Sequence, residues 1–191
     1  MQCAGLILAG GQATRFGGVD KAFVQLAGRP FIEHVLGRLS RQVASLAISA
    51  NGDPTRFAAY GLPVLADNKL FHDCGPLAGV AAGLCWAAAQ GAAFLLTSPV
   101  DTPFLPLDLR AQLEPGPAFA VHKGLSQPLC ALWPVPFISG LEAFLRQPGR
   151  HKVSEALARC AARPVEMVAP EQAFANLNSP QDLTLYEDGL R

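Results

Sequence analysis

Apolar positions in the first half of the chain follow two alternating patterns: short uninterrupted runs, and longer segments of helical period. Residues 31, 32, 35, 36 and 39 are apolar and recur on one helix face, which predicts a helix beginning near Pro30. A second helix is predicted from Gly75-Pro76 to about Gln90. The uninterrupted runs are typical of buried strands, which we expect at residues 6–8, 64–66 and 94–97. Residues 45–50 alternate loosely, which predicts a further strand.

Turn residues separate these predicted elements. A turn is expected at Asn51-Gly52-Asp53-Pro54, and another at residues 27–29 after a brief extended piece at 22–26. The second half of the chain is less regular. Strands are expected there at 119–121, 129–133 and 164–168, and helices at 137–147, 153–160 and 180–186. The sequence contains no internal repeat, low-complexity tract or domain linker.

The alternation of short apolar strands with helices predicts an α/β fold, because strands that are covered on both faces have uniformly apolar sequences. We expect a Rossmann-like, three-layer α/β/α arrangement, with a mostly parallel central sheet and helices on both faces. The chain has 191 residues, which suits a single domain covering residues 1–191.

Composition narrows the possible function classes. Half of the residues are hydrophobic, and 15 basic residues balance 15 acidic ones, which argues against disorder and against a nucleic-acid partner. The five cysteines are odd in number and scattered, as in a reducing cytoplasm, and the N-terminus lacks the features of a signal peptide. Residues 77–100 carry no charge, but their Ala and Gly content and the break at Gln90-Gly91 favour a buried helix and strand over a membrane span.

The first predicted strand runs directly into a glycine-rich stretch that contains two cations. Gly10-Gly11 permits a sharp turn and a close approach of the backbone to a ligand, and exposed N–H groups in such a turn bind anions. Arg15 and Lys21 follow, so the stretch suits the phosphates of a nucleotide. It is neither a Walker loop nor a dinucleotide fingerprint, because the spacing differs. A plain turn with solvated surface charges is the structural alternative.

Polar residues follow the other predicted strands as well. Asn51, Asp67 and Asp101 each come after a strand, and ligands gather at the carboxyl ends of parallel strands. Asp101 is a natural Mg²⁺ ligand, because this cation prefers one or two carboxylates together with phosphate oxygens and water. A helix cap or a turn aspartate before Pro103 is the alternative role for Asp101, and turn or capping roles are the alternatives for Asn51 and Asp67.

Ordered motifs along the chain resemble those of the molybdenum cofactor guanylyltransferase (MobA) family of nucleotidyltransferases. They are the N-terminal stretch ending in Gly17-Gly18-Val19-Asp20-Lys21, then Gly75-Pro76-Leu77-Ala78-Gly79, Asp101-Thr102-Pro103-Phe104, and Asn176-Leu177-Asn178-Ser179-Pro180-Gln181-Asp182-Leu183. Asp20 stands where sugar and cytidylyl relatives typically have proline, and Val100 stands where the family often has cysteine. The resemblance covers essentially the whole chain.

The resemblance implies an enzyme that transfers GMP from GTP to the terminal phosphate of molybdopterin or the molybdenum cofactor, with Mg²⁺ as cofactor and pyrophosphate as leaving group. It implies catalytic roles for Lys21, Asp101 and Arg15, with Asp101 as the metal ligand. The nucleotide-binding residues that it implies are Leu8, Ala9, Gly10, Gly11, Lys21, Asn51, Asp67, Gly79 and Asp101. It assigns Asn176 and Asn178 to the pterin substrate or the surroundings of the metal, so the N-terminal half would bind nucleotide and the C-terminal half the pterin.

Other features leave alternatives. Arg150-His151-Lys152 lies where family members often carry paired arginines, with a solvated loop as the alternative, and His72 lacks metal-ligand spacing and is expected to be incidental. Alternative functions are a cytidylyl- or sugar-phosphate nucleotidyltransferase of the same fold, and a non-catalytic nucleotide-binding adaptor in cofactor delivery. We expect a cytoplasmic monomer in transient contact with molybdenum cofactor biosynthesis proteins or recipient enzymes, and with no nucleic acid or membrane.

Overall fold

The computed structural model describes residues 2–10, 12–13 and 19–187, and it contains a central sheet of seven strands. In spatial order these are β11 (Arg163–Glu166), β9 (Ala118–His122), β10 (Leu125–Pro134), β8 (Phe94–Pro99), β1 (Cys3–Leu8), β6 (Ser45–Ser49) and β7 (Val64–Leu65). The β1–β6, β1–β8, β6–β7 and β9–β11 pairs are parallel. β10 runs antiparallel to β8 and β9. The sheet is therefore mostly parallel, which confirms the prediction.

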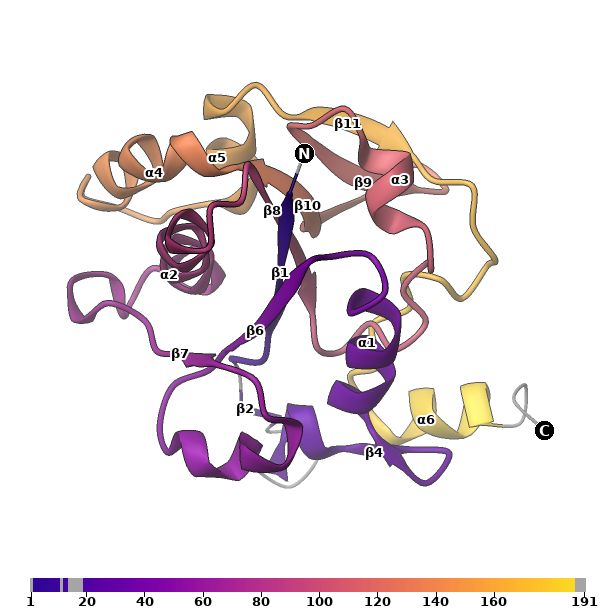
Figure 1. Cartoon of the computed structure of the whole chain (residues 1–191). Helices are drawn as coiled ribbons and strands as arrows, with labels where there is room; N and C mark the ends of the chain where they lie inside the picture. Colours follow the sequence, from indigo (N-terminus) through magenta and orange to yellow (C-terminus); the bar gives the residue numbers. More distant parts are fainter. Residues whose placement is uncertain (1, 11, 14–18, 188–191) are drawn as a thin grey trace.

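Helices cover both faces of the sheet, as Figure 1 shows. One face carries α2 (Pro76–Ala89), α4 (Ile138–Leu145) and α5 (Val153–Arg159), and the other carries α1 (Phe31–Leu39) and α3 (Leu109–Leu113). Side chains of β1 alternate between the two: Leu6 belongs to the core on the α2 side and Ile7 to the core on the α1 side. The three-layer α/β/α fold expected from the sequence is confirmed.

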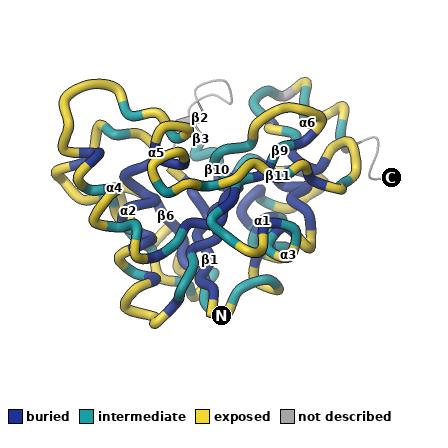
Figure 2. The backbone as a smooth tube through the Cα atoms, turned by 90° about the horizontal axis from the view of Figure 1, so that it is seen from above, coloured by how far each residue is buried: buried dark blue, intermediate teal, exposed yellow. Residues whose placement is uncertain are grey.

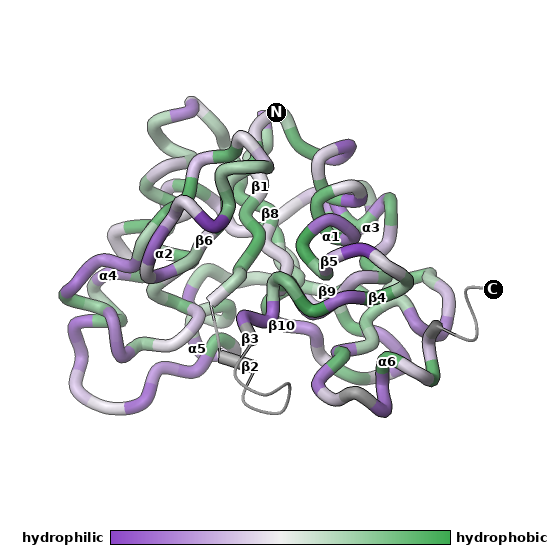
Figure 3. The backbone as a smooth tube through the Cα atoms, turned by 90° about the horizontal axis from the view of Figure 1, so that it is seen from below, coloured by the Kyte–Doolittle hydropathy of each residue, from purple (hydrophilic) through white to green (hydrophobic). Residues whose placement is uncertain are grey.

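The central strands form the buried part of the molecule. In Figure 2, β1 and β6 run through the interior in dark blue, and exposed segments lie around them. Figure 3 shows hydrophobic colours on β1 and β8 and hydrophilic colours on many of the outer connections. Every residue of β1 is buried, so this strand has the uninterrupted apolar sequence expected of a strand covered on both faces.

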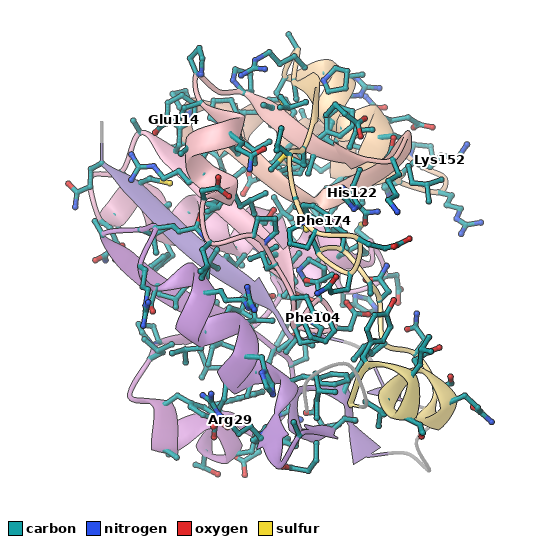
Figure 4. All side chains as sticks on the ribbon, turned by 90° about the vertical axis from the view of Figure 1, so that its right-hand side faces the viewer. Arg29, Phe104, Glu114, His122, Lys152 and Phe174 are labelled. Atoms are coloured by element: carbon teal, nitrogen blue, oxygen red, sulfur yellow. The ribbon has the colours of Figure 1, made fainter. Side chains whose placement is uncertain are left out.

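The C-terminal part of the chain returns across the sheet to the end of β8. In the connection at residues 167–179, Phe174 and Leu177 are buried. Phe174 lies beside His122 of β9, with ring centroids 5.4 Å apart, and Figure 4 shows the two side chains together. The Leu177 N–H donates to the Asp101 carbonyl over 3.2 Å. This return brings residues near 178 to the strand end that carries Asp101.

The prediction of an extended segment at residues 22–26 is wrong for residues 22 and 23, which lie in a short helix. Asp20 accepts the Ala22 N–H over 3.0 Å and thereby caps the 3₁₀ helix η2 (Lys21–Phe23). The rest of this segment is extended: Val24 has extended backbone angles, and β4 (Gln25–Leu26) pairs with β5 (Arg29–Pro30). A second small ladder joins β2 (Gln12–Ala13) to β3 (Val19–Asp20).

The predicted helices and strands are otherwise present, with shifted ends. The helix predicted at 137–147 is α4, preceded by the 3₁₀ helix η5 (Val135–Phe137), and the helix predicted at 180–186 is α6 (Pro180–Glu187). In the part of the chain that the structure describes, α3, η3 (Pro54–Tyr60) and η4 (Lys69–Phe71) also have no counterpart in the prediction. Among the described residues, no helix is long and apolar enough to cross a membrane.

Candidate active site

A pocket of about 650 Å³ lies at the carboxyl ends of β1, β6, β7 and β8. Parallel strands point these ends to the same edge of the sheet, so the polar residues that follow them converge. Eight of the predicted site residues line the pocket: Leu8, Gly10, Lys21, Asn51, Asp67, Gly79, Asp101 and Asn176. The convergence expected from the strand ends is therefore present in the structure.

Lys21 lies at the centre of the polar contacts. Its ammonium donates to the Asp101 carboxylate and to Asn178 Oδ1, the latter over 2.5 Å. The Lys21 and Asp101 side chains are 19% and 18% exposed, so the pair is largely shielded from bulk solvent while both residues line the pocket or its edge. Two of the three residues to which the resemblance gives catalytic roles, Lys21 and Asp101, are therefore in direct contact, and Asn178 joins them from the C-terminal segment.

The turn after β8 fixes Asp101. The buried Thr102 hydroxyl donates to the Pro99 carbonyl over 2.8 Å and lies 3.2 Å from Ser98 Oγ. The Leu177 N–H binds the Asp101 carbonyl on the other side. Asp101 lies in this turn and not at the start of a helix, so the helix-cap alternative is excluded and the turn alternative is not. The backbone that carries the Asp101 carboxylate is thus fixed on both sides.

A second polar pair lies after β6 and β7. Asn51 Nδ2 donates to Asp67 Oδ2 over 2.7 Å, and the Asp67 N–H donates to Asn51 Oδ1 over 2.9 Å. Each side chain is therefore oriented by the other. A carboxylate has two acceptor oxygens, so Asp67 can accept from a ligand while it keeps Asn51 in place.

Glycines shape the wall formed by the start of α2. Gly75 has φ +62° and ψ −145°, a conformation that L-residues rarely adopt, and it precedes the helix N-terminus. Gly79 packs so closely on β6 that an added Cβ would lie 2.3 Å from Ser49 Oγ. An added Cβ at Gly10 would meet nothing within 4 Å, so glycine there leaves open space. The N–H groups of the helix N-terminus suit an anion in this space.

The first part of β10 forms a further wall that sequence reasoning missed. It contributes Ser126, Gln127, Pro128, Leu129 and Cys130. The pairing of β10 shifts register between Gln127 and Ala131. A proline inside a strand is typical of such an irregularity, so Pro128 was the available signal. Burial and the nearby Asp101 carboxylate raise the pKa of the Cys130 thiol, so Cys130 contributes a neutral surface to the pocket.

His72, which was expected to be incidental, also lines the pocket. It follows η4, with its Nδ1 2.9 Å from the Lys69 carbonyl and its Nε2 2.8 Å from Asp73 Oδ2. Its sequence neighbours gave no indication of this place, because the connection between β7 and α2 brings it there.

The remaining predicted residues lie elsewhere or were not placed. Gly11 and Arg15 lie outside the described residues. Ala9 is buried, its N–H donates to the Ser49 carbonyl over 2.9 Å, and its side chain belongs to the core. The Arg150-His151-Lys152 segment lies between α4 and α5 and does not line the pocket.

The donors around Asp101 suit a hard cation. Within the described part of the chain, no three His, Cys, Asp or Glu side chains gather into a metal site. Mg²⁺ needs fewer protein ligands, because it is usually held by one or two carboxylates and completes its shell with phosphate oxygens and water. Asp101 and the Asn178 amide oxygen both contact the Lys21 ammonium, so two hard oxygen donors already converge on one cationic group.

Known proteins share both the sequence and the fold of this chain. The model of the MobA-like NTP transferase domain matches residues 5–174. A molybdenum cofactor guanylyltransferase of Cereibacter sphaeroides is 50% identical over 195 residues, which cover 100% of this chain and 98% of that protein. A molybdenum cofactor guanylyltransferase of Acidiphilium cryptum (strain JF-5) is 47% identical over 184 residues, which cover 96% of this chain and 93% of that protein.

A solved structure has the same architecture. The crystal structure of molybdopterin-guanine dinucleotide biosynthesis protein A from Archaeoglobus fulgidus has a TM-score of 0.76 to this chain at 22% sequence identity. The similarity covers 98% of each chain. It therefore extends over the central sheet and the helices on both of its faces.

Proposed function

We infer what this chain does from the family to which it belongs, the MobA-like NTP transferase family. The chain is a nucleotidyltransferase. We propose that it transfers GMP from GTP to the terminal phosphate of molybdopterin or its molybdenum form and releases pyrophosphate. Relatives named molybdenum cofactor guanylyltransferase, identical at up to 50% of positions over the full chain, support this reaction. The structural observation that carries it is one pocket holding both the Lys21–Asp101 pair and the Asn51–Asp67 pair.

The Asn51–Asp67 pair suits the guanine base. The N1–H and N2–H₂ groups of guanine are adjacent donors, and a carboxylate such as that of Asp67 accepts from both. Asn51 holds this carboxylate in place and has a second amide hydrogen to donate. Cytosine and adenine lack the adjacent ring and exocyclic donors, so the pair favours GTP.

The end of the pocket that holds Lys21 and Asp101 suits the triphosphate of GTP and the transfer of its GMP group. The acceptor phosphate attacks the α-phosphorus in line, the bond from that phosphorus to the pyrophosphate oxygen breaks, and the electron pair leaves with pyrophosphate. The acceptor phosphate is already ionised, so no side chain needs to remove a proton. Lys21 stabilises the charge that develops on the phosphate oxygens, and the α2 N-terminus supplies N–H donors.

Asp101, with the amide oxygen of Asn178, would hold Mg²⁺. The described side chains with fixed charge that line the pocket are Lys21, Asp67 and Asp101, so the protein supplies few positive charges there for a triphosphate. When bound, the cation would neutralise and orient phosphate oxygens. The protein's part is to present an oriented carboxylate, which the turn after β8 does.

The acceptor pterin is assigned to the C-terminal side of the pocket. Asn176 lines this side, Asn178 binds Lys21, and Ser126 and Gln127 add polar groups from β10. The halves of one domain, residues 1–191, would then hold one substrate each. We also expect the protein to act as a cytoplasmic monomer that meets cofactor biosynthesis proteins or recipient enzymes transiently.

Pyrophosphate release with Mg²⁺ and molybdopterin, compared between GTP, CTP and ATP, tests the proposed function. Release with GTP alone is the expected result. Release with CTP would keep the mechanism and assign the chain to cytidylyl transfer. No release with any nucleotide, from folded protein and intact pterin, would contradict the proposal and favour a sugar-phosphate substrate or a nucleotide-binding adaptor.

A further inference from the structure

A guanidinium outside the pocket connects the two polar pairs inside it. Arg56 lies in η3, and its Nη1 is 2.9 Å from Asp20 Oδ2. Its Nη2 donates to the Asn51 carbonyl over 2.6 Å. Asp20 directly precedes Lys21, and Asn51 forms the pair with Asp67. The Arg56 side chain therefore contacts both Asp20, which precedes Lys21, and the backbone of Asn51, which belongs to the other polar pair.

Asp20 connects Arg56 to the backbone of Lys21. Its two carboxylate oxygens have separate partners, because Oδ1 accepts the Ala22 N–H over 3.0 Å and Oδ2 faces Arg56. The bond to Ala22 caps η2, of which Lys21 is the first residue. The backbone that carries the Lys21 side chain is therefore fixed to η3 through a single carboxylate.

An aromatic contact holds η2 and η3 together. The fully buried Phe57 of η3 stacks on Phe23 of η2, with ring centroids 5.2 Å apart and an interplanar angle of 27°. Arg56 Cζ lies 4.9 Å from the centroid of the Phe57 ring, within cation–π range. The apolar stack keeps the two short helices in contact, and the guanidinium orients the polar groups that lead from them into the pocket.

The start of η3 directs Arg56 back toward Asn51. Asp53 caps this helix by accepting the Thr55 N–H over 2.9 Å and the Thr55 hydroxyl over 2.7 Å. These bonds lower the pKa of the Asp53 carboxyl, so the cap is charged at neutral pH. Arg56 follows within the same turn, and its guanidinium reaches the carbonyl at the end of β6.

We propose that Arg56 is a positioning residue that couples the phosphate end of the pocket to its nucleobase end. The assignment rests on the proposed function, because that function says which end receives the phosphates and which the base. Through Asp20, Arg56 orients Lys21 and so acts on the turnover number, kcat. Through the Asn51 carbonyl, it orients the pair that faces guanine and so acts on KM for GTP.

The geometry requires the fork of an arginine. Two different nitrogens each serve one acceptor, which the single ammonium of a lysine does not reproduce. The Arg56 and Asp20 side chains are 34% and 20% exposed, so solvent reaches the pair only in part. Arg56 does not line the pocket, which is why its effect is assigned to the residues that it holds.

Steady-state pyrophosphate release, with GTP varied at saturating molybdopterin and Mg²⁺, tests the proposal. Arg56→Ala is expected to lower kcat about tenfold and raise KM for GTP about fivefold, because both contacts are lost and small misplacements are costly. Asp20→Asn keeps a capping oxygen and the contact at Asn51, so kcat falls about fivefold while KM stays within about twofold of wild type. Arg56→Lys is expected to remain at least about threefold below wild type in kcat/KM.

Arg29→Ala is the matched control. Arg29 is paired with Glu33 at 3.4 Å, its side chain is 59% exposed, and Figure 4 shows it near the lower edge of the molecule. Removal of an exposed ion pair changes stability by about 0–1 kcal/mol, so this variant should keep the kinetics of wild type. The melting temperature of each variant is measured alongside, so that any loss of folded protein is corrected.

Two kinetic results would overturn the proposal. The first is an Arg56→Ala variant whose kcat and KM match those of wild type. The second is an equal loss of kcat in Arg56→Ala and Asp20→Asn that is proportional to the fraction of unfolded protein, while KM is unchanged in both variants. That second pattern is what a purely structural role for Arg56 predicts.

Equilibrium binding of GTP distinguishes failure of this proposal from failure of the proposed function. If wild-type protein binds GTP but releases no pyrophosphate, the proposed guanylyl transfer is contradicted and the coupling by Arg56 is not. The coupling is still supported in that case if Arg56→Ala weakens GTP binding about fivefold and Asp20→Asn leaves it within about twofold. Equal GTP affinities for wild type and Arg56→Ala overturn the coupling, whatever reaction the enzyme performs.

Discussion

The ammonium of Lys21 is shared between a carboxylate and an amide oxygen. Asp101 and Asn178 reach it from the end of β8 and from the C-terminal segment, so the three groups hold one another in place before any substrate binds. A preorganised charge of this kind costs no rearrangement when charge develops on a phosphate. Its effect on the rate should therefore exceed its effect on stability.

Replacing Asp101 by alanine tests this at the level of one side chain. We expect Asp101→Ala to lower kcat by about 10²–10³, as loss of a preorganised charge stabiliser usually does, while the far-UV circular dichroism spectrum stays that of wild type. The measurement is pyrophosphate release at saturating GTP and Mg²⁺. Unchanged turnover would remove Asp101 from the mechanism.

Two variants serve as comparisons for Asp101→Ala. Asp108 precedes α3 and makes no side-chain capping bond, so Asp108→Ala should stay within about twofold of wild type. Arg150→Ala should lose less than Asp101→Ala, because the basic segment does not line the pocket. A loss at Arg150 as large as that at Asp101 would show that this segment takes part in catalysis.

Because of Cys3, the stability of the folded state depends on pH in the alkaline range. Burial raises the pKa of its thiol from 9.0 to about 11, so above pH 9 the unfolded chain releases this proton while the folded chain retains it. The folded state then binds more protons, and its stability falls as pH rises. The contribution is fully present below pH 9 and is lost by pH 11.

Comparison of wild type with Cys3→Ala isolates this contribution. Between pH 8 and pH 10, the free energy of unfolding of wild type should fall by about 1 kcal/mol relative to that of Cys3→Ala. Urea unfolding at both pH values, with a reductant present, measures it. A difference that does not change with pH would mean that the Cys3 thiol ionises equally in both states.

The sequence predicted the site residues that directly follow a strand. It did not predict the residues that are brought to the site by contacts with distant parts of the chain. Lys21, Asp67 and Asp101 follow local signals of strand and turn, and all three line the pocket. Arg56 has no such signal, because its partner Asp20 belongs to another loop and only the fold brings them together. No local signal places His72 at the pocket either, because the connection between β7 and α2 brings it there.

At the scale of elements, glycines let α2 approach the sheet. A Cβ added at Gly83 would lie 2.5 Å from Leu6 Cδ2 and 3.0 Å from Leu95 Cδ2, and both leucines are fully buried. Gly79, one turn earlier, meets Ser49 in the same way. The stripe of glycines on α2 therefore sets the distance between this helix and β1, and with it the position of the helix N-terminus at the pocket.

Gly83→Ala should destabilise the protein by about 1–3 kcal/mol, because overpacking a tight core outweighs the gain in helix propensity. Gly37 of α1 is the matched control, since an added Cβ there meets nothing within 4 Å. Gly37→Ala should stabilise by about 0.5–1 kcal/mol. Urea denaturation measures both, and equal effects of the two substitutions would contradict the packing account.

Long elements were predictable because each carries enough apolar residues to be recognised, and short ones were not. α1 shows a helical period, whereas α2 is apolar on all sides and was recognised by its start at Gly75-Pro76. The first central strand was recognised by its uninterrupted apolar run. η2, η3 and η4 last three to seven residues and start at Asp20, Asp53 and Asn68, whose side chains accept N–H bonds two residues on. Such caps also suit plain turns, so the sequence around Arg56 predicted only a turn.

At the scale of the whole molecule, β10 joins the two halves of the chain. It pairs with β8 on one side and β9 on the other, so the strands of both halves form one continuous sheet. The buried Trp133 of β10 donates its indole N–H to Thr97 Oγ1 of β8 over 3.0 Å. The pattern of strands predicted the α/β class, but the pairing partners of β10 follow from long-range contacts that no local pattern encodes.

A continuous sheet of this kind should unfold as one cooperative unit, and two single-tryptophan variants test this. Trp86→Phe leaves Trp133 to report from the C-terminal half, and Trp133→Phe leaves Trp86 of α2 to report from the N-terminal half. In each variant the urea midpoint from fluorescence should coincide with that from far-UV circular dichroism of the same variant. GTP should move both probes together, because binding stabilises the folded state as a whole. Separate midpoints in either variant would show that the halves are independent folding units, and the prediction of one domain over residues 1–191 would then be wrong.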